Sequence, residues 1–274
     1  MKKISIFLIL TFIKLFSVSE GVASGSDTSA VLAKLFFRLM ASRDDTDRIR
    51  INDSIKFIID GYSESDTAFT HRFDNLKYLG QITSKDSRLK IITWNLILAD
   101  SPGRYYCYFI NNTGKQSRVY RIEGRYTEAP VKSDVIYNEK DWYGALYYDL
   151  RRYGKGSENY WVLLGIDFGN PSVTRKIIDV VSFTPEGGII FGRRIFGQGN
   201  TAKFREVLEY SSEAVVSLKF VSDKSIVFDH LVPLSPAMKD NKQYYGPDFS
   251  YDAFNLEKGT WIFRSNVDIR NRKK

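Results

Sequence analysis

The apolar positions along the chain repeat with two different periods. Over residues 28–42 they recur every three or four positions, which predicts an amphipathic helix. A second helix is predicted to begin within the acidic segment 44–47, whose side chains are suitable N-caps. Its buried face would consist of Ile51, Ile55, Ile58 and Tyr62. Gly61 would end this helix in the left-handed conformation.

From about residue 76 the period changes to two, which is typical of β-strands. Lys90, Ile92, Trp94, Leu96 and Leu98, for example, would share one strand face. Strand-like runs are predicted near 76–83, 88–99, 104–111, 117–124, 142–151, 158–168, 175–183, 188–192, 204–211, 214–221, 225–231 and 260–264. Connections this short join antiparallel neighbours. The predicted fold class is therefore α+β, mainly antiparallel β, with two N-terminal helices followed by a sandwich- or barrel-like β body; a small propeller is a further alternative.

The first 23 residues have the pattern of a signal peptide. Lys2 and Lys3 precede a mostly apolar run, and small residues at Gly21 and Ala23 suit a signal peptidase, so we expect cleavage near Ala23. An uncleaved anchor is the alternative, but this run is shorter than the roughly 20 apolar residues that cross a bilayer. We therefore expect export to the periplasm or cell envelope, or to the extracellular space, and no transmembrane span after cleavage.

The remaining chain is expected to divide by secondary structure. A helical segment would cover 24–70 and a β-rich body 71–274, with a subdivision of that body near 126–139, where the chain is polar and contains a proline.

A chain of 274 residues buries a large core without a disulfide or a metal. Its one cysteine, Cys107, cannot form an intrachain disulfide, and its aromatic surroundings predict a buried, unreactive thiol.

The net positive charge of the chain is too small to indicate a particular class of binding partner. The formal net charge is +8, and removal of residues 1–23 takes away three lysines and one glutamate, which leaves +6. The basic residues are most concentrated at the C-terminus, within 264–274, where a solvated tail is the simplest interpretation. Because nucleic-acid binding needs a basic folded face with stacking aromatics, we expect no nucleic-acid partner.

Several stretches resemble a family of uncharacterised exported β-rich proteins from bacteria of the Bacteroidota. They are His71–Leu76, Arg88–Asn95, Trp142–Tyr148, Val162–Asp167, Thr174–Val180, Ile226–Pro233 and Tyr244–Asp252. The resemblance implies export to the periplasm or cell envelope and helices that precede a β-rich body. It implies no activity and no functional residues. The chain departs from the family pattern at 84–87 and 168–170, both in predicted turns.

The catalytic candidates are His230, Asp229, Asp248 and Asp252. Asp229 and His230 suggest part of a triad, but neighbours on a strand point to opposite faces, so another carboxylate would have to orient the imidazole. Asp248 and Asp252 are also the metal candidates, because their spacing is that of the start of a calcium loop. The glycine and glutamate of an EF-hand are missing, and a tight turn with Asx-type caps is the alternative to a looser calcium site.

The sequence excludes a zinc site, does not favour a dinucleotide site, and offers aromatic residues as candidates for ligand binding. Two histidines and one cysteine exclude a multi-histidine or paired-cysteine zinc site. The glycines at 197–199 fit a loose dinucleotide pattern, but a hairpin turn is the preferred interpretation. The ligand-binding candidates are Trp142, Tyr244 and Tyr245, whose rings are suited to stacking on a sugar. Packing in a core or across strands is the alternative for each.

These patterns together predict an exported protein of the periplasm or cell envelope. A non-enzymatic binding or structural module, with an envelope protein or a glycan as partner, is the first expectation. No cofactor is expected in it. A secreted hydrolase of glycan or ester type that uses the aspartates and His230, and a calcium-stabilised β protein, are the alternatives. The sequence does not define an oligomeric state.

The leader generates the first testable prediction. The exported chain should lack residues 1–23 and begin near Ser24, because a signal peptidase removes the leader during translocation. Intact mass and N-terminal sequencing of the protein from periplasmic, envelope and cytoplasmic fractions measure this. Full-length protein found in the cytoplasmic fraction alone would contradict it.

Overall fold

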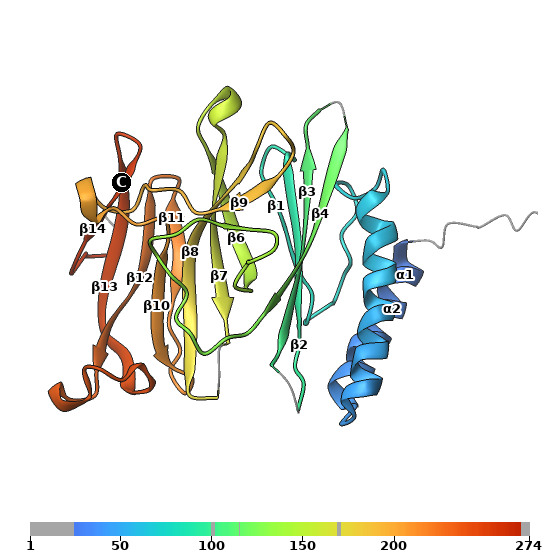
Figure 1. Ribbon diagram of the computed structural model, residues 1–274, viewed down its shortest axis with the longest axis horizontal. Coiled ribbons are helices and arrows are strands. Elements are labelled where there is room, and N and C mark those ends of the chain that lie inside the picture. The colour runs from blue at the N-terminus through green and yellow to red at the C-terminus, as the bar shows by residue number, and fades with distance from the viewer. Residues whose placement is uncertain (1–24, 100–101, 115, 169–170, 270–274) are drawn as a thin grey trace, which may run out of the picture.

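The computed structural model describes residues 25–99, 102–114, 116–168 and 171–269, in which two helices and three antiparallel sheets form successive layers (Figure 1). The predicted leader, residues 1–23, lies outside the described residues. The predicted α+β class, with two N-terminal helices before a sandwich-like β body, is confirmed. None of the three described sheets closes into a barrel. Within the described residues, no helix combines the length and apolar character needed to span a membrane.

The helices are α1 (Gly25–Ala41) and α2 (Asp45–Glu64). Asp44 caps α2, as predicted, because its carboxylate accepts the N–H groups of Thr46 at 2.7 Å and Asp47 at 3.4 Å. The predicted stop at Gly61 is wrong: α2 continues to Glu64, and Ser65 is its C-cap. Gly61 is an ordinary helical residue here, because packing of the last turn against the sheet outweighs the glycine's weak helix propensity.

The first sheet has both faces covered. It contains β1 (Gly80–Thr83), β2 (Leu89–Leu96), β3 (Arg104–Asn112) and β4 (Ser117–Arg125), paired in that order. Ile92 and Trp94 share one face, as predicted, and this face packs on the helices, while Ile91 and Phe109 face the second sheet. Because both faces are covered, successive residues of β2 and β3 are buried almost throughout instead of alternating with exposed ones.

Two further sheets complete the stack. The second contains β5 (Tyr137–Asn138), β6 (Leu146–Tyr153), β7 (Tyr160–Asp167), β8 (Val173–Phe183), β9 (Ile189–Phe191) and β10 (Glu206–Ser211) in the order β5-β9-β8-β7-β6, with β10 on β8. The third contains β11 (Leu218–Ser222), β12 (Ser225–Pro233), β13 (Tyr245–Glu257) and β14 (Thr260–Arg264), in chain order. Short 3-10 turns lie at Gly156–Glu158, Gly199–Thr201, Pro236–Met238 and Lys242–Tyr244.

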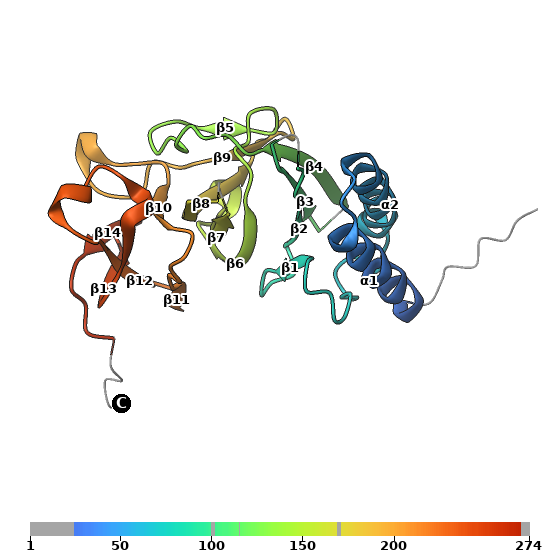
Figure 2. The same cartoon turned by 90° about the horizontal axis from the view of Figure 1, so that it is seen from below.

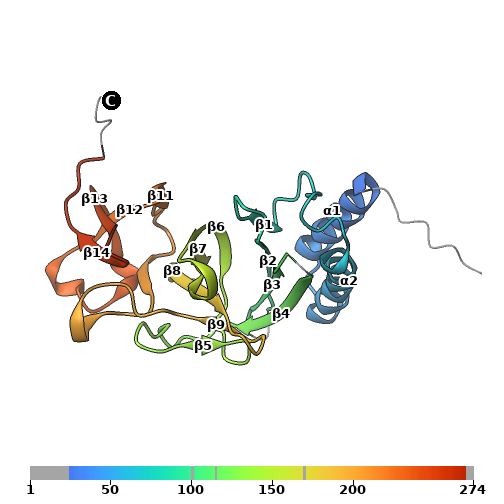
Figure 3. The ribbon, with the colours of Figure 1, turned by 90° about the horizontal axis from the view of Figure 1, so that it is seen from above.

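The helices, the first sheet, the second sheet and the third sheet follow one another as four layers (Figures 2 and 3). Three apolar clusters join these layers. The first lies between the helices and the first sheet, the second between the first and second sheets, and the third between the second and third sheets. Cys107 lies in the second cluster with no exposed surface, and burial raises the pKa of its thiol well above the ordinary value. The prediction of a buried thiol is confirmed.

Residues 245–257 depart from the sequence interpretation. They form strand β13, the longest in the described chain, although no strand was predicted there. The predicted Asx-type turn is nevertheless present inside the strand, because Asp248 Oδ1 accepts the Ser250 N–H at 3.0 Å and Phe249 has a φ of 71°. The irregular pairing of β12 with β13 accommodates this turn, so turn residues and strand pairing coexist.

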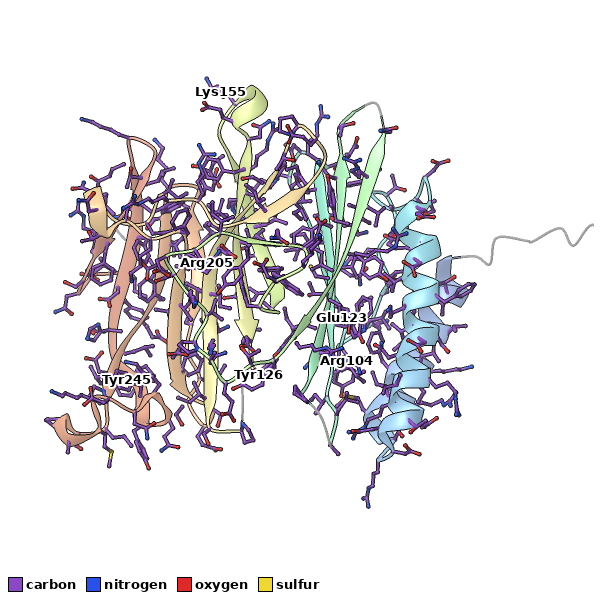
Figure 4. The ribbon with its side chains drawn as sticks, viewed as in Figure 1. Arg104, Glu123, Tyr126, Lys155, Arg205 and Tyr245 are labelled. Atoms are coloured by element: carbon purple, nitrogen blue, oxygen red, sulfur yellow. The ribbon has the colours of Figure 1, made fainter. Side chains whose placement is uncertain are left out.

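The chain between β4 and β5, residues 126–136, crosses from the first sheet to the second without regular secondary structure, and we call it the strap. Arg205 anchors it. This side chain has no exposed surface and donates to the strap carbonyls of Lys132 at 2.6 Å and Val135 at 2.8 Å (Figure 4). It also donates to the Asp179 carboxylate on β8 at 3.2 Å. One guanidinium therefore ties the strap to the second sheet.

The Arg205–Asp179 pair should dominate the response of stability to mutation. Arg205→Met leaves a buried carboxylate without its cation, so we expect a loss of about 3–5 kcal/mol in the free energy of unfolding. Urea denaturation measures this. Arg264→Met, which removes an exposed pair with Glu257, is the matched control and should cost less than about 1 kcal/mol. Equal losses in the two variants would contradict the assignment.

Candidate functional site

Two of the predicted catalytic residues lie in contact on the third sheet. His230 Nδ1 and Asp252 Oδ2 are 2.7 Å apart, with the imidazole on β12 and the carboxylate on β13. The register of the two strands shifts between Asp229 and Leu231, and such a bulge redirects the side chains beside it. Asp252 is thus the separate carboxylate that the sequence interpretation required to orient His230.

This pairing defines the electrostatics of the imidazole. The hydrogen bond to Asp252 raises the pKa of His230, and the negative charges of Asp252 and Asp248 act in the same direction, against a smaller effect of burial. The second oxygen of Asp252 accepts the backbone N–H of Asn266 at 3.2 Å, which holds the carboxylate in place. The His230 side chain is 38% exposed, so solvent screens the pair.

The pair lies in a groove of about 580 Å³ between β10 and the third sheet. Asp229 also lines the groove, but its carboxylate accepts the Ser217 N–H at 2.7 Å. Thr201 is the only residue with an aliphatic hydroxyl among the described lining residues, which include no serine or cysteine. The arrangement therefore supplies an oriented imidazole without an activated serine or cysteine nucleophile beside it.

The metal candidates are already engaged within the protein. Asp248 Oδ1 accepts the hydroxyl of Ser250 at 2.7 Å, and Asp252 binds His230. Among the described residues, no three His, Cys, Asp or Glu side chains gather in a group suited to a metal ion. In the described residues, Asp248 and Asp252 therefore lack the third carboxylate, histidine or cysteine that would complete such a group.

The aromatic candidates lie in three different settings. Trp142 is part of the core between the first and second sheets, and its indole N–H donates to the Tyr147 hydroxyl at 3.1 Å. Tyr244 is partly exposed at the end of a 3-10 turn. Tyr245, labelled in Figure 4, lines the His230 groove and lies under the Lys242 ammonium, 3.7 Å from the ring centroid. The three do not form one sugar-binding platform.

A larger cavity, of about 1050 Å³, opens where the helices and the first and second sheets end together. Most of its lining is apolar or aromatic. It comes from α1 and α2, the segment before β1, the adjoining ends of β2 and β3 with residues just beyond them, the start of the strap, and Phe168 and Pro171 between β7 and β8. Four large apolar side chains of this lining are at least half exposed: Met40, Tyr78, Ile97 and Phe168. Such a gathering of exposed apolar surface around a cavity is typical of a ligand site.

Buried polar contacts hold two walls of this apolar cavity. Arg175, which is paired with Asp167 at 3.2 Å, donates to the strap carbonyls of Thr127 and Glu128, each at 3.3 Å. At the other oxygen of the same carboxylate, the Tyr105 hydroxyl donates to Asp167 at 2.7 Å, and it accepts the Phe168 N–H at 3.2 Å. The cavity is therefore shaped by a connected network before any ligand is bound.

Two arginines of the described chain line the cavity, and each is paired with one carboxylate. Arg104 lines it, and its ion pair with Glu123 is long, at 3.8 Å. Arg48, the other arginine of the lining, is paired with Asp45 at 3.6 Å and also donates to the Ser42 carbonyl at 2.9 Å and the Ile97 carbonyl at 3.2 Å. In Figure 4, Tyr126 lies near the same end of the strands as Arg104. Arg104, whose ion pair is the longer of the two, is thus the cation that an acidic ligand would meet, and Glu128 is the one acidic residue among the described lining.

Sequence interpretation did not identify this cavity. Its lining residues come from segments far apart in the chain, and no local motif connects them. Ile97 lies within the predicted strand 88–99, whereas β2 ends at Leu96. One signal was present: Phe168 occupies the lengthened loop after Asp167, where a turn was predicted. An apolar side chain in a predicted loop is such a signal, since loops are usually polar.

In comparisons with known proteins, no family model, no curated protein and no solved structure matches this chain. The resemblance to exported proteins of the Bacteroidota stays a prediction. Function is therefore argued from the two cavities and the residues that line them.

The His230–Asp252 contact makes a prediction about titration. Asp252→Asn should lower the pKa of His230 toward or below its ordinary value of about 6.5, because the anionic partner is removed. Proton NMR of the imidazole C–H resonances measures this. Asp229→Asn is the matched control and should leave the pKa of His230 unchanged, since Asp229 binds a backbone N–H.

The sign of the linked stability follows from the raised pKa of His230. The pair stabilises the fold fully below about pH 6.5, and its contribution is lost as the pH rises through the raised value. An identical pKa of His230 in the wild type and in Asp252→Asn would show that the contact does not form in solution.

Proposed function

We propose that this protein is an exported, non-enzymatic binding module of the periplasm or cell envelope, and that its ligand is an apolar molecule carrying one acidic group. The observation that carries the proposal is the cavity of about 1050 Å³ with Met40, Tyr78, Ile97 and Phe168 exposed around it. Export rests on the leader pattern of residues 1–23.

The chemistry of the lining supports this ligand class over a glycan. Sugars need several polar side chains and a stacking ring, whereas aliphatic and aromatic groups form most of this surface. Burial of an alkyl chain stabilises a complex by about 25 cal/mol per Å² of apolar area removed from water. Arg104 supplies a charge for a carboxylate, and a charge-assisted hydrogen bond there would fix the orientation of the ligand.

A hydrolase is the second candidate, and the His230–Asp252 contact in a groove is the observation that favours it. Because the described groove lining lacks serine and cysteine, His230 would have to act as a general base on water. That role needs a neutral imidazole, and the raised pKa of His230 works against it near neutral pH. The binding function is therefore the better supported of the two.

Binding of a long-chain fatty acid tests the proposed function. We expect palmitate to bind the mature protein with a dissociation constant in the micromolar range or below, measured by displacement of a fluorescent fatty acid. Ile97→Glu places a charge on the cavity rim and should weaken binding about tenfold or more, because the charge would have to lose water beside an apolar ligand.

Val215→Glu is the control for that experiment. Val215 is 88% exposed and does not line the apolar cavity, so this variant adds the same charge elsewhere and should bind palmitate as the wild type does. Absence of binding by the wild type, or equal losses in the two variants, would refute the proposed site.

A further inference from the structure

A separate cavity of about 360 Å³ lies beside β1, the outer strand of the first sheet. Its walls come from the segment between α2 and β1, from β1 and β2, and from β6 of the second sheet. It shares no lining residue with the apolar cavity. Four cationic side chains line it, Arg72, Lys85, Lys90 and Arg151, against the single carboxylate of Asp149.

Lys90 is the unusual member of this group, because the residue is only 2% exposed. Its ammonium donates to the Tyr62 hydroxyl and, at 2.8 Å, to the His71 carbonyl. No carboxylate of the described residues pairs with it within ion-pair distance. Buried cations are normally paired with anions, so this lysine lacks the counter-charge that its burial calls for.

Of the three other cations that line the cavity, two have carboxylate partners among the described residues and one does not. Arg151 is occupied by Asp149 at 2.6 Å, and Lys85 lies 3.6 Å from Asp223. Arg72 has no ion pair within the described part of the chain, and its positive charge acts on Lys90. Lys90 and Arg72 together therefore present two uncompensated cations to one cavity.

The wall that carries these groups is held in place. Gln81 on β1 donates to the Phe73 carbonyl at 2.9 Å and accepts the Phe73 N–H at 3.1 Å. The Tyr62 hydroxyl from α2 donates to the Ala68 carbonyl at 3.0 Å, and it also contacts the His71 carbonyl. The segment with His71 and Arg72 is thus fixed to the sheet and to α2 around Lys90. An ammonium has three N–H groups and two are engaged, so the third remains for a ligand.

We propose that this cavity binds a small oxyanion, a carboxylate or a phosphate group, between the Lys90 ammonium and the Arg72 guanidinium. The bound anion supplies the counter-charge that buried Lys90 lacks. The site is independent of the proposed apolar ligand, because the two cavities have no residue in common.

Protonation of Lys90 couples to this binding. Burial, assisted by the charge of Arg72, lowers the pKa of Lys90 to about 8. The other titratable groups that line the cavity are His71, Lys85, Asp149 and Arg151, and the Tyr62 hydroxyl contacts Lys90 from α2. An anion favours the charged ammonium, so binding should raise the pKa of Lys90 and should weaken as the pH rises above about 8.

Isothermal titration calorimetry of the mature protein with inorganic phosphate and, separately, with succinate tests the site. We expect at least one of the two anions to bind at pH 7, and the anion that binds shows whether phosphate or carboxylate is preferred. Affinity should fall about tenfold or more between pH 7 and pH 9.5, because few Lys90 ammonium groups remain charged at the higher pH.

Variants assign the binding to the two cations. Lys90→Met should weaken binding about ten- to hundredfold, the size expected for a lost charge-assisted contact. Lys176→Met is the matched control, since Lys176 lies over the Tyr148 ring outside this cavity, and it should bind as the wild type does. Arg72→Met tests the second cation, and because Arg72 is exposed this variant keeps the fold even if Lys90→Met does not.

Three results would contradict the proposed anion site. Failure of both anions to bind the wild type at pH 7, or an affinity unchanged at pH 9.5, overturns the proposal. Equal losses in Arg72→Met and Lys176→Met also overturn it, because they would indicate non-specific attraction to a basic protein.

Discussion

The buried guanidinium of Arg205 is the contact on which the path of the strap most depends. The strap, residues 126–136, has no strand or helix of its own, so its carbonyls need side-chain donors. Arg205 provides them, and it binds Asp179 and the Phe191 carbonyl at the same time. Because the Arg205 and Asp179 side chains have no exposed surface, the contact specifies one path of the strap. The start of that strap forms a wall of the apolar cavity.

The three candidate sites share a position relative to the layers. Side chains fill the space between layers in the three apolar clusters, so hollows form only where strands end or where a sheet has an outer strand. The apolar cavity lies at the ends of the first two sheets, the cationic cavity beside β1, and the His230 groove between β10 and the third sheet. Stacking of layers thus accounts for three chemically different surfaces in one chain.

The sequence predicted what depends on local periodicity and missed what depends on tertiary contacts. The helix cap at Asp44 and the helix-facing side of β2 follow from neighbours in the chain, and both are present. Strand β13 was missed because Pro247 and Asp248 are turn residues, and only pairing with β12 and β14 makes the segment a strand. The contact of His230 with Asp252 joins residues 22 positions apart through the strand register, which no spacing rule could specify.

The position of Cys107 makes its thiol a natural probe of opening between the first and second sheets. It is the single thiol in the chain, and it lies fully enclosed between two sheets. A maleimide or a disulfide reagent can reach its sulfur only when those two sheets separate, so the rate of labelling reads out the free energy of that opening directly. Transient separation of the first and second sheets can therefore be measured in the natural chain, without an engineered label.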